Sequence, residues 1–176
     1  MQAAGVALPL SVNVSPAQFH KDDFVERVRT IVAESGAAAS QLIFEITEGL
    51  LIENWESTSL RMKELVAMGV RFSIDDFGTG YSSLAYLKKL PLYELKIDRS
   101  FVNEAPGDPN DRAIVQSILS VARILNLRVV AEGVETRAQA DFLIAEHCDC
   151  LQGYFYARPH PLIEWLERRL DSIQVR

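Results

Sequence analysis

The chain has 176 residues, of which 48% are hydrophobic, and its formal net charge is −6. This balance predicts one globular core and argues against direct DNA or RNA binding, because phosphate backbones are normally bound by a basic surface. No apolar run approaches the length of a membrane span, so we expect no membrane segment in this chain and a cytoplasmic location.

Short apolar stretches, each ending in a polar residue, recur along the chain. The first stretch, at residues 10–14, carries Asn13, and apolar residues with helical spacing follow it. The second stretch, at residues 42–44, delivers Glu45, with Glu48 just beyond it, and is again followed by helical spacing. This alternation predicts a strand and then a helix, twice over.

The third stretch, at residues 70–74, ends in two adjacent aspartates, Asp75 and Asp76, and a glycine-rich run follows. Adjacent carboxylates repel each other and lose hydration on burial, so the pair indicates a bound divalent cation. Hard oxygen ligands of this kind suit Mg²⁺ or Mn²⁺. Alternatively, one aspartate could cap a helix beginning near Ser82, which explains either residue alone better than it explains the pair.

Three further apolar stretches follow. The fourth, at residues 92–97, contains Lys96 and is followed by Asp98. The fifth, at residues 129–131, and the sixth, at residues 150–151, are followed by Glu132 and Gln152. Six alternations of strand and helix predict a parallel sheet covered by helices. Polar groups at the ends of several strands are typical of a closed α/β barrel, whereas an open doubly wound sheet gathers its ligand at one crevice. We therefore predict an α/β fold, a TIM-like barrel with about six parallel βα units, incomplete because eight units usually need about 250 residues.

Residues that favour helix boundaries flank three of the helical segments. They are Asp22, Asn54 and Asp111 at the starts, and Gly36, Gly69 and Asn126 at the ends. Residues 103–110 are the only linker-like segment, and we interpret them as a long loop between a strand and a helix rather than as a domain boundary.

Taken together, these motifs resemble those of the EAL family of bacterial cyclic di-GMP phosphodiesterases, in the same order and at the same intervals. The matching segments are Ser11–Ser15, Phe44–Glu48, Ile74–Ser83, Leu95–Asp98, Val130–Glu135 and Gln152–Tyr154. The resemblance runs from the first few residues to about Pro161. The Glu-Ala-Leu motif itself is absent, so we expect residues 1–176 to be a single EAL-type domain, truncated at its N-terminus and without its first two strands and their helices.

The resemblance implies that cyclic di-GMP is hydrolysed to linear pGpG by a two-metal mechanism with Mg²⁺ or Mn²⁺. It implies that one metal is held by Asn13, Glu45 and Asp75, and the second by Asp75, Asp76 and Glu132. Lys96 would orient the attacking water or stabilise charge on the phosphate, and Glu132 could also accept a proton. Glu48 would steady the Asp-Asp-Phe-Gly loop, while Glu135 and Gln152 would lie around the substrate.

Simpler interpretations stand beside these roles. Glu48 and Glu135 could each start the following helix, where acidic residues are favourable. Lys96 could form an ion pair inside the barrel with Asp98 or Glu45.

Two other functions compete with the phosphodiesterase. A catalytically degenerate EAL-like domain could act as a signalling or scaffolding module without turnover, and an enolase-like metal barrel fits the spacing but not the Asp-Asp-Phe-Gly-Thr-Gly-Tyr run. Because the missing part would carry a metal-binding glutamate and a phosphate-binding arginine, we expect turnover by this chain alone to be impaired or absent. An incomplete barrel would also expose strand edges and apolar surface, which predicts self-association or a homodimer.

Overall fold

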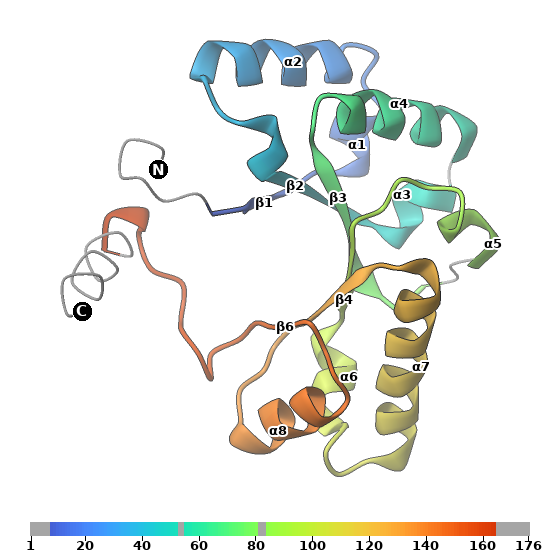
Figure 1. The fold of residues 1–176 in the computed structure, drawn as a ribbon, viewed down its shortest axis with the longest axis vertical. Coiled ribbons are helices and arrows are strands. Elements are labelled where there is room, and N and C mark those ends of the chain that lie inside the picture. The colour runs from blue at the N-terminus through green and yellow to red at the C-terminus, as the bar shows by residue number, and fades with distance from the viewer. Residues whose placement is uncertain (1–7, 53–54, 81–83, 165–176) are drawn as a thin grey trace.

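The structure is a computed structural model, and it describes residues 8–52, 55–80 and 84–164. Its centre is a sheet of six parallel strands in chain order, each hydrogen-bonded to the next. The strands are β1 (Leu10–Asn13), β2 (Leu42–Thr47), β3 (Arg71–Phe77), β4 (Glu94–Ile97), β5 (Arg128–Ala131) and β6 (Cys150–Leu151). The sheet curls into a half-barrel, which confirms the predicted incomplete TIM-like fold (Figure 1).

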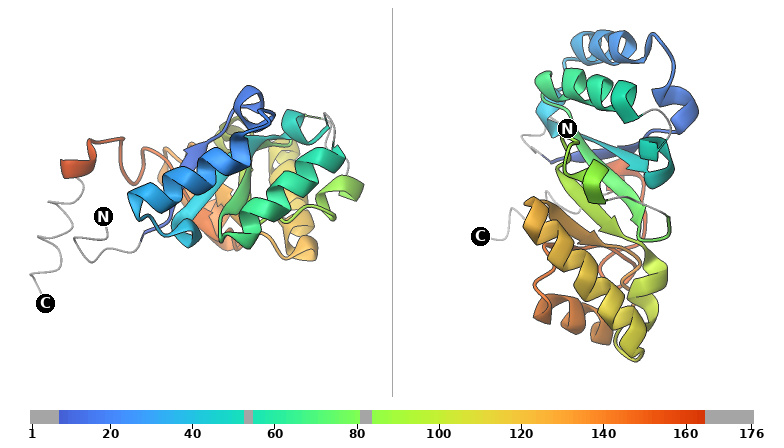
Figure 2. Two further views of the ribbon diagram at one scale, coloured as in Figure 1. Left: turned by 90° about the horizontal axis from the view of Figure 1, so that it is seen from above. Right: turned by 90° about the vertical axis from the view of Figure 1, so that its right-hand side faces the viewer.

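Helices cover the outer face of this arc. They are α1 (Pro16–Phe19), α2 (Phe24–Ser35), the 3-10 turn η2 (Ala39–Gln41), α3 (Glu48–Ile52), α4 (Trp55–Ala67), α5 (Leu84–Leu87), α6 (Arg99–Glu104), α7 (Pro109–Leu125) and α8 (Arg137–Ala145). Figure 2 shows α2 beside α4 at one end of the arc and α6 beside α7 at the other.

Side chains alternate between the two faces of each strand, because successive residues of a strand point in opposite directions. Apolar residues on the helix side form the core, among them Phe44, Ile46, Phe72, Ile74, Leu95, Ile97, Val129 and Ala131. The intervening residues on the inner face are largely polar, and Glu45, Ser73 and Glu94 follow one another across three strands in register. The inner face of the half-barrel therefore carries buried charge.

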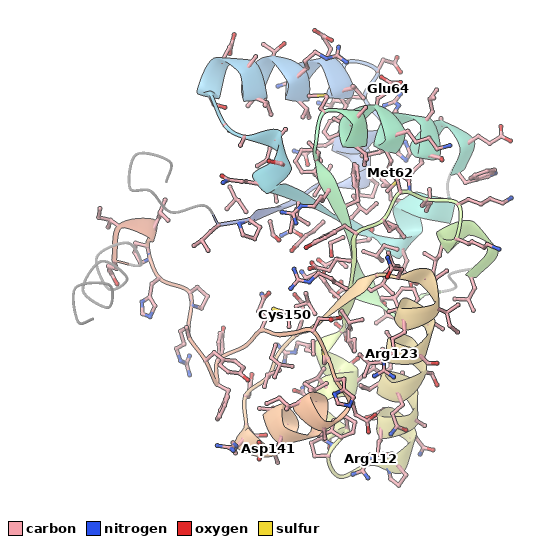
Figure 3. All side chains as sticks on the ribbon, viewed as in Figure 1. Met62, Glu64, Arg112, Arg123, Asp141 and Cys150 are labelled. Carbon is pink, nitrogen blue, oxygen red and sulfur yellow. The ribbon has the colours of Figure 1, made fainter. Side chains whose placement is uncertain are left out.

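The helices are amphipathic, which fixes them to the sheet. On α4, Met62 is fully buried and Glu64 is exposed (Figure 3). Arg61 on the same helix donates hydrogen bonds to the carbonyl oxygens of Phe19, at 2.8 Å, and Lys21, at 2.6 Å. These bonds connect α4 to the last residue of α1 and to the segment that follows it.

The boundary predictions are confirmed at some helix ends and wrong at two helix starts. Gly36 and Asn126 end α2 and α7 in the left-handed conformation, with φ of 65° and 56°. At the N-terminus of α2, Asp23 rather than Asp22 is the cap residue, and Asn54 lies outside the described residues.

The predicted long loop at 103–110 is also wrong. Helix α6 extends to Glu104, and α7 begins at Pro109 rather than near Asp111. The Asp108 carboxylate accepts a hydrogen bond from the Asn110 backbone N–H at 2.6 Å, and proline is favoured at the first helical position. An aspartate cap followed by proline therefore starts the helix two residues earlier than predicted.

The strand β1 forms one edge of the described sheet and lies open to solvent. Its residues Leu10 and Val12 are 50% and 37% exposed, although both are large and apolar. Among the described residues, no helix has both the length and the apolar character that a membrane crossing requires.

Candidate metal centre

The candidate centre is built around the end of β3, where Asp75 and Asp76 follow each other. In a regular strand these two side chains would point to opposite faces of the sheet. Asp76 instead adopts a left-handed conformation, with φ of 52°, and the pairing of β3 with β4 shifts register between Ile74 and Phe77. Irregularities of this kind re-aim side chains next to functional sites. Here the irregularity lets both aspartates contribute to one site.

Glu132, which directly follows β5, completes a group of three acids. One carboxylate oxygen from each of Asp75, Asp76 and Glu132 lies within 4.8 Å of the other two. Asp75 Oδ1 is buried, and the Lys96 ammonium lies 2.9 Å from it. Three converging carboxylates offer the hard oxygen donors that a divalent cation such as Mg²⁺ or Mn²⁺ prefers.

Lys96 on β4 lies among the carboxylates and touches three of them. Its Nζ is 2.7 Å from Glu132 Oε1, 2.9 Å from Glu45 Oε2 and 2.9 Å from Asp75 Oδ1. Burial of the Lys96 side chain disfavours its charged form, but hydrogen bonding to the three carboxylates outweighs this and raises the pKa of Lys96 above its ordinary value. The raised pKa favours the charged form of Lys96 among these acids.

Burial and neighbouring charges shift the pKa values of the acids in and beside this group. Burial raises the pKa of Glu132, and the neighbouring Lys96 only partly offsets this. Burial also raises the pKa of Asp76, together with repulsion from Asp75. Asp98 behaves differently, because hydrogen bonds from the hydroxyl and backbone N–H of Ser100, where it caps α6, outweigh its burial and lower its pKa.

The other two predicted metal ligands lie farther along the sheet. Glu45 is buried on β2 and reaches the centre through its ion pair with Lys96, outside the group of three acids. Asn13 is exposed on β1 and pairs in register with Glu45. The alternative of an ion pair between Lys96 and Glu45 is thus present in the structure, together with the contacts to Asp75 and Glu132.

Glu48 holds the loop that follows the two aspartates. It is the first residue of α3, and its Oε1 accepts a hydrogen bond from the Gly78 backbone N–H at 3.1 Å. Gly78 has a φ of 101°, and an added Cβ would lie 3.0 Å from the Phe101 ring of α6, so a larger residue would need Phe101 to move. Starting a helix and supporting the loop are therefore compatible roles for Glu48.

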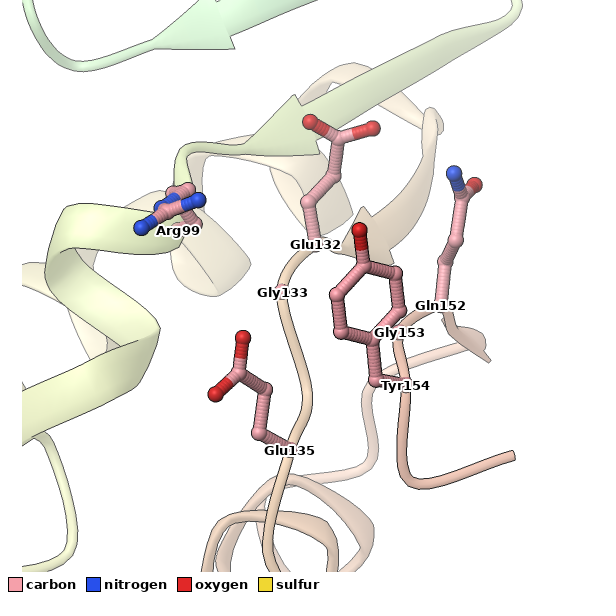
Figure 4. A pocket seen from close by; sticks show the side chains of 7 residues that line it. All are labelled: Arg99, Glu132, Gly133, Glu135, Gln152, Gly153 and Tyr154. Atoms are coloured by element: carbon pink, nitrogen blue, oxygen red, sulfur yellow. The ribbon is translucent and has the colours of Figure 1, made fainter. Parts of the chain in front are cut away.

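Beside the centre lies a cavity of about 200 Å³. Its lining includes Glu135 and Gln152, the two residues predicted to lie around the substrate (Figure 4). Glu132 forms one of its walls, so the cavity adjoins the acid group. Arg99 and Tyr154 also line it, and sequence reasoning did not assign a role to either. In the sequence, Arg99 directly follows Asp98, and Tyr154 comes two residues after Gln152. This closeness to strand-end polar residues was the signal that could have pointed to them.

Comparison with known proteins identifies the relatives of the chain. The EAL domain family model matches residues 1–159. The bifunctional diguanylate cyclase/cyclic di-GMP phosphodiesterase MucR of Pseudomonas aeruginosa is 48% identical over 152 residues, which cover 86% of this chain and 22% of MucR. The chain thus spans only about a fifth of that relative's length.

Solved structures agree with this result. The structure of the MucR phosphodiesterase in complex with cyclic di-GMP has a TM-score of 0.86 and 46% identity, over 89% of this chain and 64% of that one. The Klebsiella pneumoniae BlrP1 complex with manganese and the same dinucleotide has a TM-score of 0.81 and 30% identity, over 90% of this chain and 41% of BlrP1. These matches exclude the enolase-like alternative, and the chain belongs to the EAL domain family.

Proposed function

We propose that this chain carries the metal centre and part of the substrate site of a cyclic di-GMP phosphodiesterase, which hydrolyses the cyclic dinucleotide to linear pGpG. The observation that carries the proposal is the convergence of carboxylate oxygens from Asp75, Asp76 and Glu132, two of which, Asp75 and Glu132, also contact the ammonium group of Lys96. The cyclic di-GMP phosphodiesterase activity of MucR and its complex with cyclic di-GMP support the same substrate.

The acids would hold divalent cations, Mn²⁺ or Mg²⁺, and the manganese complex of BlrP1 supports the first of these. Asp75, Asp76 and Glu132 would hold one ion, while Asn13, Glu45 and Asp75 would contribute to another. When bound, such ions supply an activated water and neutralise charge on the phosphodiester.

The residues of the chain itself supply positioning and proton transfer. Lys96 holds Glu132 and Asp75 in place and carries a fixed positive charge that can stabilise the phosphate oxygens. The raised pKa of Glu132 brings this carboxylate closer to the range in which a general base works best at neutral pH. Glu48 keeps the loop after Asp76 in position through the Gly78 backbone.

We further propose that residues 1–176 form a single EAL-type unit and that its open sheet edge at β1 promotes self-association or a homodimer. The exposure of Leu10 and Val12 supports this proposal. The same edge carries Asn13, whose exposure supports the second candidate function, a signalling or scaffolding module with little or no turnover.

A turnover assay distinguishes the two functions. The purified chain, with excess Mn²⁺ or Mg²⁺, would be incubated with cyclic di-GMP, and linear pGpG would be followed by chromatography. A version extended upstream through two further strands serves as the reference, and Glu132→Gln serves as the inactive control. We expect slow turnover by the chain and faster turnover by the longer version. Binding of cyclic di-GMP without pGpG formation in either protein would favour the scaffolding module.

A further inference from the structure

Two arginines and a tyrosine form a second polar group, at the edge of the sheet opposite the candidate metal centre. Arg71 is the first residue of β3, Arg128 is the first residue of β5, and Tyr93 directly precedes β4. These three strands are parallel neighbours, so their N-terminal ends lie at one edge. Asp75 and Glu132 lie toward the other ends of β3 and β5. The group is therefore separate from the acids of the candidate metal centre.

The two arginines share one aromatic ring. The guanidinium carbon of Arg71 lies 4.4 Å from the centroid of the Tyr93 ring, and that of Arg128 lies 5.7 Å from it. Arg128 Nη1 also donates a hydrogen bond to Tyr93 Oη at 2.9 Å, so the hydroxyl proton of Tyr93 is available for another acceptor. Tyr93 therefore gathers two positive charges in one place, although the whole chain has a net charge of −6.

Arg71 is half-buried but lacks the partners that a buried cation normally has. Among the described residues, its buried Nε has no hydrogen-bond acceptor, and no carboxylate forms an ion pair with it. Arg61 is the only other half-buried arginine of the described chain, and it donates to two backbone carbonyls and pairs with Asp22 at 3.3 Å. Because a buried cation is costly unless it is paired, Arg71 has an unmet demand for an anion that Arg61 does not have.

A neighbouring acid, Glu94, does not neutralise both arginines. Its Oε2 lies 4.0 Å from Arg128 Nη1, which is the outer limit of an ion pair, and its Oε1 accepts a hydrogen bond from Ser73 Oγ at 3.1 Å. Glu94 is only 5% exposed, and burial raises its pKa, which disfavours its charged form. The positive charge of the two arginines therefore exceeds the negative charge beside them.

We propose that Arg71, Arg128 and Tyr93 form a binding site for a phosphate group. Guanidinium groups match phosphate oxygens with paired N–H donors, and the Tyr93 hydroxyl supplies a further donor. A phosphate dianion would neutralise both arginines, whereas a carboxylate has only a single charge. The phosphate could be the free ion or part of a small phosphate ester. The site is independent of the proposed function, because its three residues lie outside the candidate metal centre.

Thermal unfolding of the chain in EDTA, at constant ionic strength and mildly alkaline pH, tests the proposal. EDTA removes divalent ions, so phosphate cannot bind through a metal at the acid group. We expect inorganic phosphate to raise the unfolding midpoint in a saturable way, because a ligand of the folded state stabilises it. Acetate should bind about tenfold more weakly. Glycerol phosphate distinguishes the sources: a shift equal to that of inorganic phosphate indicates an ester, and a smaller shift indicates the free ion.

Variants separate site binding from the general stabilisation that phosphate gives to proteins. Arg71→Met should weaken the saturable phosphate effect by about tenfold, because it removes one guanidinium group and keeps the apolar stem. Arg128→Met, at a side chain that is 43% exposed, should do the same and serves as the second variant if Arg71→Met does not fold. Arg27→Met, exposed on α2, is the matched control and should respond like the unaltered chain.

Three results would overturn the phosphate site. One is the absence of a saturable midpoint shift in the unaltered chain. Another is an equal phosphate response in Arg71→Met, Arg128→Met and Arg27→Met, which would mean that phosphate acts through the solvent alone. The third is equal stabilisation by acetate, because a single charge would then suffice. The proposed phosphodiesterase function would stand in each case, since the assay contains no divalent metal and no cyclic di-GMP.

Discussion

Lys96 Nζ lies 2.7 Å from Glu132 Oε1, so a cation of the protein itself occupies the group of carboxylates that we assign to divalent metals. The side chain of Lys96 is only 6% exposed and also contacts Glu45 and Asp75. In a buried setting, three acids without a counter-ion would repel one another strongly. Lys96 therefore stabilises the metal-free centre, and metal ions would interact with the same acids.

Replacing Lys96 by methionine should separate the effect of Lys96 on stability from its effect on metal binding. We expect Lys96→Met to destabilise the metal-free chain by about 3–5 kcal/mol, because removing one partner leaves buried carboxylates uncompensated. Mn²⁺ affinity should rise by about tenfold, since the ion no longer shares its ligands with an ammonium group. Urea unfolding in EDTA and Mn²⁺ titration by electron paramagnetic resonance measure the two quantities.

The exposed Lys63→Met on α4 is the matched control and should change neither quantity. Weaker Mn²⁺ binding by Lys96→Met would show that Lys96 organises the metal ligands rather than shares them.

Asparagine substitutions at Asp75 and Asp98 should differ in their effect on metal binding. Asp75 belongs to the group of three acids, whereas Asp98 caps α6 through the Ser100 backbone N–H at 2.9 Å. We expect Asp75→Asn to weaken Mn²⁺ binding by about 100-fold and Asp98→Asn by less than about tenfold, because asparagine also caps helices well. Isothermal titration with Mn²⁺ measures both, and equal losses would argue against a bridging role for Asp75.

Much of the fold could be predicted from the sequence, because apolar stretches ending in polar residues define parallel strands whose C-terminal ends share one edge. The six strands and their order are confirmed. The loop predicted at 103–110 was wrong because a short cap, Asp108 before Pro109, outweighed the polar composition of the segment.

Less of the candidate site than of the fold could be predicted from the sequence. Asp75, Asp76 and Glu132 lie at the ends of β3 and β5, but the left-handed conformation of Asp76, which aims two consecutive carboxylates into one site, could not be read from the sequence. Arg99 and Tyr154 were missed because their approach depends on the tight packing of Gly133 and Gly153 between segments that are far apart in the chain. The metal and substrate roles of the predicted residues remain predictions.

A methyl group at Gly80 should disturb the loop after the aspartates. A Cβ at this position would meet the Glu48 carboxylate, which holds Gly78, whereas at Gly107 it would make only an ordinary contact. We expect Gly80→Ala to cost about 1–3 kcal/mol of stability and to weaken Mn²⁺ binding, while Gly107→Ala changes neither. Thermal unfolding with and without Mn²⁺ measures the difference, and indistinguishable curves for the two variants would mean that the loop position does not depend on Glu48.

The last prediction concerns Glu94, which lies on the inner face of β4 and is only 5% exposed. Burial raises the pKa of Glu94, although the hydrogen bond from Ser73 Oγ at 3.1 Å and the charge of Arg128 partly oppose this shift. Between the ordinary value of 4.5 and the raised value, the folded protein binds more protons at this site than the unfolded chain does. The stabilising contribution of the protonated group is therefore fully present below about pH 4.5 and is lost as the pH rises through the pKa of the folded state.

Glu94→Gln keeps the shape of the protonated side chain and removes its titration. We expect the free energy of unfolding of the unaltered chain to fall relative to that of Glu94→Gln as the pH rises from 4.5 to 7.5, because only the unaltered chain must ionise a buried acid. Urea unfolding in EDTA at several pH values measures this difference. The exposed Glu64→Gln should instead run parallel to the unaltered chain. If the difference for Glu94→Gln is independent of pH, or if the unaltered chain gains stability over it with rising pH, then the ionised Glu94 is better stabilised by Ser73 and Arg128 than its burial implies.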